Sequence, residues 1–154
     1  MTKNELSFEY FLANNGYVRI PLITSNIGHL QVMVRLQNES GFFIVDTGAS
    51  ITLIDKPFAK QASLNWTYPK EQVNISGGRA QELLEVAEVQ LQIDQLAFQL
   101  PQLYVGDLSD INKALTQKGS RGISGVLGAD ILLARSAIID YKTAAMYLKP
   151  HSGN

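Results

Sequence analysis

Residues 42–50 read Phe-Phe-Ile-Val-Asp-Thr-Gly-Ala-Ser, the most informative stretch of the chain. An apolar run delivers Asp46 into a turn at Gly48, and a second, largely apolar run leaves the turn at 51–54. Taking a carboxylate out of water without partners is costly. An acid in this position is therefore expected to be held by hydrogen bonds, by a metal or by a catalytic task.

Length and composition limit the classes of protein to consider. The 154 residues suit one domain, and the absence of cysteine excludes disulfides, thiolate metal sites and a thiol nucleophile. The formal net charge is -1, from 13 basic and 14 acidic residues, which does not favour a nucleic-acid partner. No apolar stretch approaches the ~20 residues of a membrane span.

The compartment stays open at this stage. Met1–Glu5 is polar and lacks the apolar core of a signal peptide. We therefore expect a cytoplasmic protein by default, or a periplasmic or membrane-anchored one if a leader or anchor has been removed.

Alternating apolar and polar residues predict a succession of short strands. Strands at 17–23 and 30–36 precede turn residues at 38–41, and a third strand then ends at Asp46. Later strands are expected at 73–75 and from about 81 to 93 around a glycine-tipped turn, with a bulge or bend near Ala87, and then at 96–100, 103–105, 126–128, 137–141 and 144–148.

Short helices are expected between some of these strands. Asp55 is a candidate N-cap for a helix at 58–64, and Ser109-Asp110 can cap a helix over 111–115. A third helix is expected at 129–134. Many short strands with few helices predict a mostly β barrel or sandwich.

One strand-end Asp is half of a catalytic site. Peptide hydrolysis by carboxylates needs two acids in different protonation states, one to activate water and one to protonate the substrate. Two carboxylates about 3 Å apart share a proton for this purpose. The chain has no second Asp-Thr/Ser-Gly, so two copies related by a twofold axis would have to supply the pair.

Two segments together carry a family resemblance. Val45–Ser50 resembles the active-site motif of the retropepsin-like aspartic proteases, and Leu127-Gly128-Ala129-Asp130 resembles the family's second signature, an apolar-Gly turn before a short helix. The segments 138–141 and 146–148 resemble the terminal hairpin of its bacterial and cellular members. The spacing between the two signatures, longer than in retroviral enzymes, places an insertion at Asp107–Arg121.

The resemblance implies a fold and a domain plan. It covers 17–150 and implies a mostly β, closed acid-protease barrel with one to three short helices and one Asp-Thr-Gly loop per chain. Residues 1–16 would be an N-terminal extension, 72–84 a flap, and 151–154 a tail.

The resemblance also implies roles for individual residues. The catalytic residues would be Asp46, Thr47 and Gly48. The substrate-binding residues would be Ala49 and Ser50 of the loop, with Ser50 supporting the carboxylate, and Ser76, Gly77, Gly78 and Arg79 of the flap. The second signature would contribute Leu127, Gly128 and Asp130 structurally.

The implied protein is an aspartic endopeptidase, active as a homodimer on an extended peptide, with no metal and no cofactor. Ala129 stands where retroviral enzymes carry an arginine that braces the dimer. The terminal hairpin is therefore expected to build the dimer sheet.

Two alternatives stay open. One is a non-catalytic, dimeric peptide-binding or regulatory module on the same fold, because a fold does not establish turnover. The other is a chain that acts only after trimming of its first dozen or so residues.

Other polar residues have simpler interpretations. Asp130 is expected to cap the helix that follows it rather than to act in catalysis. His29 and His151 are far apart in sequence and suggest neither a metal site nor a triad. Ser50 has no evident His/Asp arrangement around it and is not expected to be a nucleophile.

Overall fold

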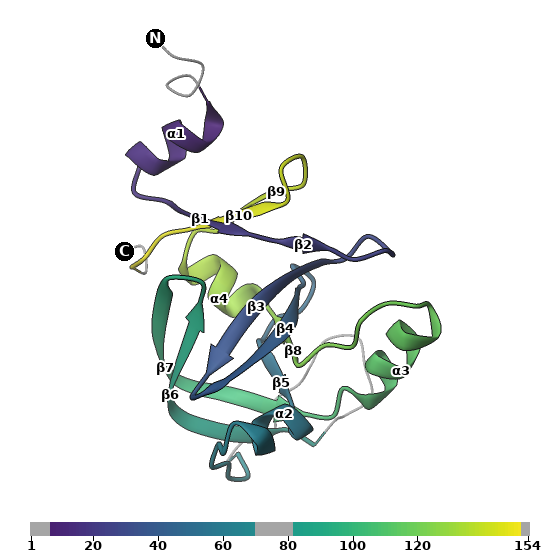
Figure 1. Cartoon of the computed structure of the whole chain (residues 1–154). Coiled ribbons are helices and arrows are strands. Elements are labelled where there is room, and N and C mark those ends of the chain that lie inside the picture. Colours follow the sequence, from purple (N-terminus) through teal and green to yellow (C-terminus); the bar gives the residue numbers. More distant parts are fainter. Residues whose placement is uncertain (1–6, 70–81, 152–154) are drawn as a thin grey trace.

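A computed structural model describes residues 7–69 and 82–151, and Figure 1 shows their arrangement. In chain order the elements are α1 (Phe8–Asn14), β1 (Val18–Pro21), β2 (Ile23–Thr24), β3 (Leu30–Leu36), β4 (Glu39–Val45), β5 (Leu53–Asp55), α2 (Lys56–Gln61), β6 (Leu84–Ile93), β7 (Leu96–Gly106), α3 (Ser109–Gln117), β8 (Gly125–Leu127), α4 (Ala129–Ala134), β9 (Ile138–Asp140) and β10 (Ala145–Leu148).

The larger sheet closes into a barrel. Its strands follow the order β2-β3-β4-β8-β5-β7-β6, and β6 also pairs with β3, so six strands from β3 to β6 form a closed ring. The main apolar core fills the barrel with side chains such as Phe43, Leu91, Ile93 and Phe98, each no more than 1% exposed. The predicted mostly β, closed barrel is confirmed.

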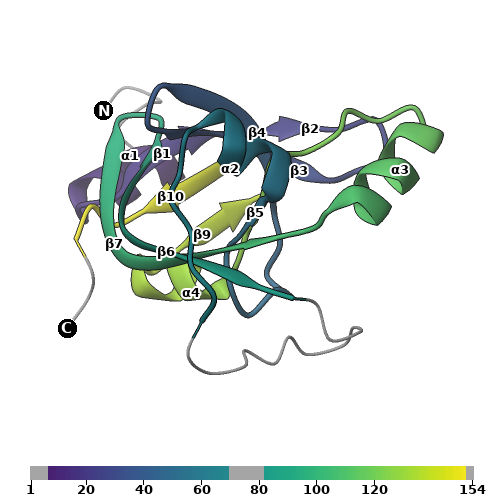
Figure 2. The same ribbon diagram turned by 90° about the horizontal axis from the view of Figure 1, so that it is seen from below.

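A second, three-stranded sheet packs against the barrel in the order β1-β10-β9. Met146 and Leu148 of β10 face the barrel core, whereas Ala145 and Tyr147 face the other side. Helix α1 covers that other side, where its Leu12 is buried and its Phe8 ring meets the Tyr147 ring edge-on at 6.0 Å. Figures 1 and 2 show α1 and α3 at opposite ends of the molecule.

Helix α1 is the main element that the sequence did not predict. The structure describes four helices, one more than the upper limit expected. Ser7 caps α1 by accepting a hydrogen bond from the Tyr10 N–H (3.1 Å). Residues 8–14 carry three aromatic rings but have only one buried side chain, so their apolar pattern gives no helical face.

The β3–β4 turn is shorter than expected. It consists of Gln37 and Asn38 alone, with φ at +54° for Gln37, and β4 already begins at Glu39. Residues 38–41 look like turn formers, but Glu39, Ser40 and Gly41 pair with β3. A two-residue loop fixes the register of the strand that leads to Asp46.

The irregularity expected near Ala87 is a bend. Glu88 has φ at +49°, and buried positions change phase there, from Val86 to Val89. The β6–β7 register continues unchanged on both sides of the bend, so no residue is inserted. Pro101 lies inside β7 and does not interrupt it. In this register Pro101 falls opposite Glu88, the residue at the bend of β6.

The two expected helix caps are not formed. Asp55 occupies the N-cap position of α2 but makes no capping hydrogen bond there. The N-cap of α3 is Leu108, and the helix itself begins at Ser109. Most of the expected flap, including Ser76 to Arg79, lies outside the described residues.

Candidate active site

The Asp46 loop follows directly from β4. The Asp46 N–H donates to the Leu127 carbonyl of β8 (3.0 Å), and the Asp46 carbonyl accepts from the Ala49 N–H (3.2 Å). Gly48 donates its N–H to Oδ1 of Asp46 (2.8 Å). These bonds fix the backbone and orient the carboxylate from within the same loop.

Gly48 lies close to the carboxylate that it binds. A β-carbon at this position would lie 3.2 Å from Oδ1 of Asp46, tighter than an ordinary van der Waals contact. The missing side chain leaves one side of the carboxylate open to approach.

The carboxylate of Asp46 is exposed in the single chain, as are Thr47, Gly48 and Ser50. Among the described residues, no hydrogen bond from Ser50 to Asp46 is formed, and the Gly48 N–H is the donor instead. The acid at the end of the buried strand therefore keeps its hydration and remains available to a partner.

The second signature crosses behind this loop. The Ala129 N–H donates to the Ala49 carbonyl (2.7 Å). A β-carbon on Gly128 would lie 2.5 Å from the Ile51 carbonyl oxygen and 2.9 Å from that of Ala49. Only glycine allows the two backbones to approach so closely.

Thr52 joins the two segments through side-chain hydrogen bonds. Its side chain is fully buried; its hydroxyl donates to Oδ1 of Asp130 (2.7 Å) and accepts from the Gly128 N–H (3.0 Å). The Thr52 N–H donates to Oδ2 of Asp130 (2.9 Å). The N-cap position of α4 is Gly128, but Oδ1 of Asp130 accepts from the Ile131 N–H in the first turn of the helix (2.9 Å), and the same carboxylate holds the strand leaving the Asp46 loop.

An apolar cluster lies beside the loop. Ala49 and Ile51 pack against buried side chains of β5, of β8, of the α3 segment and of the residue before β6, namely Leu53, Leu83, Leu108, Leu115, Ile123 and Val126. Tyr104 of β7 packs against the same cluster. Burial raises the pKa of the Tyr104 phenol, and the charges of Glu85 and Asp130 raise it further.

Helix α3 is tied to the barrel by a buried polar junction. Asp55 is 7% exposed, and its carboxylate accepts from the Leu108 N–H (3.0 Å) and from Nδ2 of Asn112 (3.3 Å). Oδ1 of Asn112 accepts from the Ile123 N–H (2.7 Å). The segment expected as an insertion at 107–121 is therefore held in place by hydrogen bonds beside the Asp46 loop.

The structure thus brings the loop residues 46–50 together with 127–130. The flap residues Ser76, Gly77, Gly78 and Arg79 lie outside the described part of the chain. Sequence reasoning missed Thr52 and Asn112. The one sequence feature that points to Thr52 is that it is a polar residue within an apolar run. No feature of the neighbouring sequence points to a role for Asn112.

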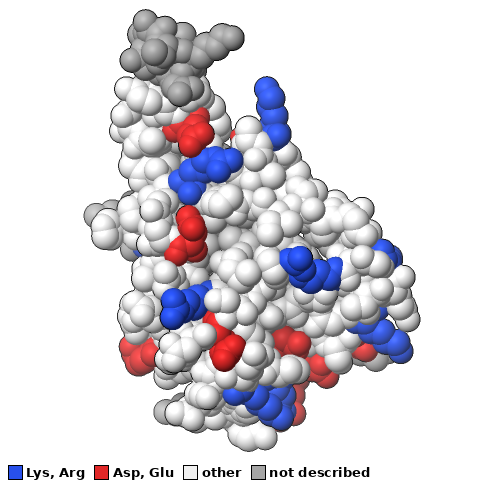
Figure 3. Space-filling model, viewed as in Figure 1, with Lys and Arg blue, Asp and Glu red and all other residues white. Residues whose placement is uncertain are grey.

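Charged side chains give no single-sign surface on the face seen in Figure 3, where acidic and basic groups are interspersed. Within 7–69 and 82–151, no group of three or more His, Cys, Asp or Glu side chains could hold a metal ion. No helix in these ranges is long and apolar enough to span a membrane.

Comparisons with known proteins agree with this geometry. The family model described as aspartyl protease matches residues 32–131. No curated protein matches the sequence significantly. The matched span contains both the Asp46 loop and the segment that crosses behind it, and the chain belongs to this aspartyl protease family.

Solved structures define the branch of the fold as retropepsin-like. A retropepsin-like aspartic protease from Rickettsia conorii is 20% identical with a TM-score of 0.55, over 86% of this chain and 90% of that one. The retroviral protease-like domain of Ddi1 from Leishmania major is 17% identical with a TM-score of 0.56, over 78% and 87%. The EIAV protease, solved with the inhibitor HBY-793, is 17% identical with a TM-score of 0.51, over 71% and 91%.

Proposed function

We propose that this protein is an aspartic endopeptidase whose active site forms when two Asp46 loops meet in a homodimer. The observation that carries the proposal is the exposed Asp46 carboxylate, oriented by the Gly48 N–H on a loop fixed to β8. The membership of the aspartyl protease family supports it. Each chain supplies one such loop, so the second carboxylate has to come from another copy.

The three-stranded sheet offers the dimer contact. β9 lies at one edge of this sheet, beside β10, and pairs with no second strand among those described. The side chains of Ile138–Asp140 are partly exposed. Pairing of this edge with its symmetry mate would continue the sheet between subunits, as expected for a twofold interface.

The proposed chemistry uses only the two carboxylates and a water molecule. The ionised Asp46 takes a proton from the water as the water oxygen attacks the peptide carbonyl carbon. The protonated Asp46 of the other subunit gives its proton to the carbonyl oxygen. Collapse of the tetrahedral intermediate then breaks the C–N bond, as one carboxyl proton passes to the leaving nitrogen and the other, ionised carboxylate takes a proton from a hydroxyl of the intermediate.

The neighbouring residues would serve the same site. Thr47 is proposed to contact its symmetry mate, Gly48 to let the substrate backbone approach, and Ala49 and Ser50 to line the groove. Ser76, Gly77, Gly78 and Arg79 are proposed to close over an extended peptide bound as an added strand. Leu127, Gly128 and Asp130 would support the loop from behind.

Turnover of fluorogenic peptides from acidic to neutral pH tests this proposal. Asp46→Asn is expected to preserve the fold and the dimer while abolishing hydrolysis. Retained hydrolysis in that variant would exclude the mechanism. Saturable peptide binding by the wild type without turnover at any pH would favour the peptide-binding or regulatory module instead.

A further inference from the structure

An apolar surface lies uncovered beside the edge strand β9. Of the nine large apolar side chains that stay exposed in the described part of the chain, four belong to α1 or to the turn after β9, namely Phe8, Tyr10, Phe11 and Tyr141. Phe11 is 61% exposed. Apolar side chains that gather in one place on a surface, unlike single scattered ones, mark a site of contact with another molecule.

Phe11 projects from the side of α1 that faces away from β1. Leu12 points into the cluster between α1 and the sheet, and the Glu9 carboxylate reaches toward β1, 3.9 Å from Nε of Arg19. Successive residues of a helix are about 100° apart, so Phe11 lies on the opposite side of Leu12 from Glu9, about 160° around the helix from it. Because the strands follow the order β1-β10-β9, the side away from β1 is the side of β9.

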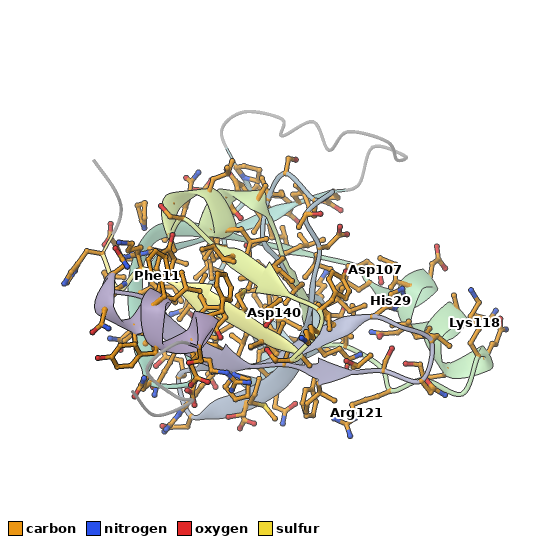
Figure 4. The ribbon with its side chains drawn as sticks, turned by 90° about the horizontal axis from the view of Figure 1, so that it is seen from above. Phe11, His29, Asp107, Lys118, Arg121 and Asp140 are labelled. Atoms are coloured by element: carbon orange, nitrogen blue, oxygen red, sulfur yellow. The ribbon has the colours of Figure 1, made fainter. Side chains whose placement is uncertain are left out.

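This side of α1 is continuous with the free edge of the sheet. Ile138 of β9 packs against the same cluster as Leu12 and Tyr147. Among the described strands, β9 pairs with β10 alone. Figure 4 looks down on the sheet from the α1 side, with α1 at one end of β9 and β10 and Asp140 farther along them. The unpaired strand edge and the exposed rings of α1 therefore belong to one surface.

The β9 edge alone is too small to hold a dimer together. It has three residues, whereas a stable interface buries about 800 Å² on each partner. Each aromatic side chain that becomes fully covered adds about 150–250 Å². The only charged residue of α1 is Glu9, which lies beside Arg19, so the rings can approach a second copy without bringing like charges together.

We infer that α1 is a dimerisation helix, which packs Phe8 and Phe11 on a second copy of this chain beside the β9 edge. This inference rests on the proposed function, because it names the surface that brings in the second Asp46 loop. It gives the N-terminal segment a role opposite to that of a segment removed for activation. Loss of α1 should weaken assembly of the active site and should not release activity.

The dissociation constant of the dimer, measured by sedimentation equilibrium, tests this role. Phe11→Ser removes a ring without opening the core, because the side chain is largely exposed. Loss of one aromatic anchor of an interface raises the Kd about thirtyfold. Tyr68→Ser is the matched control, since Tyr68 is 74% exposed but lies outside α1 and the three-stranded sheet, and it should leave the Kd unchanged. An unchanged Kd in Phe11→Ser would overturn the inference.

Hydroxyl-radical labelling of the wild-type protein tests the contact without any substitution. The labelling is compared at protein concentrations above and below the measured Kd. Phe8 and Phe11 should lose labelling in the dimer, whereas Tyr68 should be labelled equally in both states. Equal labelling of Phe8 and Phe11 in the monomer and the dimer would show that α1 stays uncovered, and would overturn the inference.

Peptide hydrolysis separates assembly from chemistry. Phe11→Ser should lose activity at low enzyme concentration and regain the wild-type kcat at a concentration that restores the dimer. A kcat that stays low in the restored dimer would overturn a role confined to assembly. Higher activity in a chain that begins at Tyr17 would overturn the inference in favour of activation by trimming.

The outcomes also distinguish this inference from the proposed function. Hydrolysis that is lost in Asp46→Asn, together with an unchanged Kd in Phe11→Ser, would overturn the role of α1 alone. A dimer that depends on Phe11 but hydrolyses no peptide at any pH would contradict the proposed function and leave the role of α1 standing. A wild-type protein that is monomeric at every concentration would contradict both.

Discussion

The Thr52 hydroxyl is expected to contribute far more to the free energy of unfolding than an ordinary threonine hydroxyl does. It is fully buried, donates to Asp130 (2.7 Å) and supports the Gly128 N–H (3.0 Å). Thr52→Val keeps the shape but removes both bonds, leaving the Gly128 N–H without this acceptor. One hydrogen bond to a charged group together with one stranded buried donor amounts to about 3 kcal/mol of unfolding free energy.

Urea unfolding measures this loss, at one protein concentration for both variants, because the proposed dimer would make the stability depend on concentration. Thr116→Val is the matched control. Its exposed hydroxyl bonds only to carbonyls of its own helix, Asn112 (3.0 Å) and Lys113 (3.1 Å), and its removal should cost no more than about 0.5 kcal/mol. A similar small loss in both variants would refute the view that Thr52 holds the Asp46 loop and the crossing segment together.

Three further changes have expected outcomes. Gly128→Ala places a β-carbon 2.5 Å from a carbonyl oxygen of the segment leaving the loop, and it should lower the yield of folded protein; a wild-type melting temperature would contradict this crossing. Asn112→Ala removes one partner of the buried Asp55 carboxylate and should cost about 2 kcal/mol in urea unfolding, whereas a change under 0.5 kcal/mol would show that α3 is held by other contacts. A hydrogen bond from the Thr143 hydroxyl lowers the pKa of Asp140 below its ordinary 3.8. The ionised carboxylate therefore stabilises the fold fully above about pH 4, and this stabilisation is lost as the pH falls through the lowered pKa of the folded protein. The melting temperature of Asp140→Asn should depend less on pH in this range than that of the wild type, and equal pH dependence would refute the role of Asp140.

The parts of the fold that follow from local pattern were predictable. Alternation along 30–36 and the apolar run into Asp46 fixed the two strands, and the hairpin at 137–148 has its expected strands. The Leu127–Asp130 signature predicted a short strand followed by a helix, and both are present. These features depend on neighbours in the chain, which sequence shows directly.

The predictions that were wrong or missing concern residues whose contacts lie far away along the chain. Asp55 reads as a helix cap, but its carboxylate is taken by α3, more than fifty positions along the chain. Asp130 was expected to cap α4, and it does accept from the Ile131 N–H there, but its bonds to Thr52 could not be foreseen from the local sequence. Helix α1 is stabilised because Leu12 and Phe8 pack against Tyr147, near the other end of the chain. A short polar side chain satisfies a cap and a tertiary contact equally well, and only the fold decides between them.

A crystal structure of the protein with a peptide-like inhibitor would give the distance between the two Asp46 carboxylates, on which the proposed active site depends. We expect a twofold dimer with these groups within about 4 Å of each other, close enough to share a proton and a water molecule. A monomer, or a dimer whose Asp46 carboxylates lie much farther apart on the inhibitor-bound form, would contradict it.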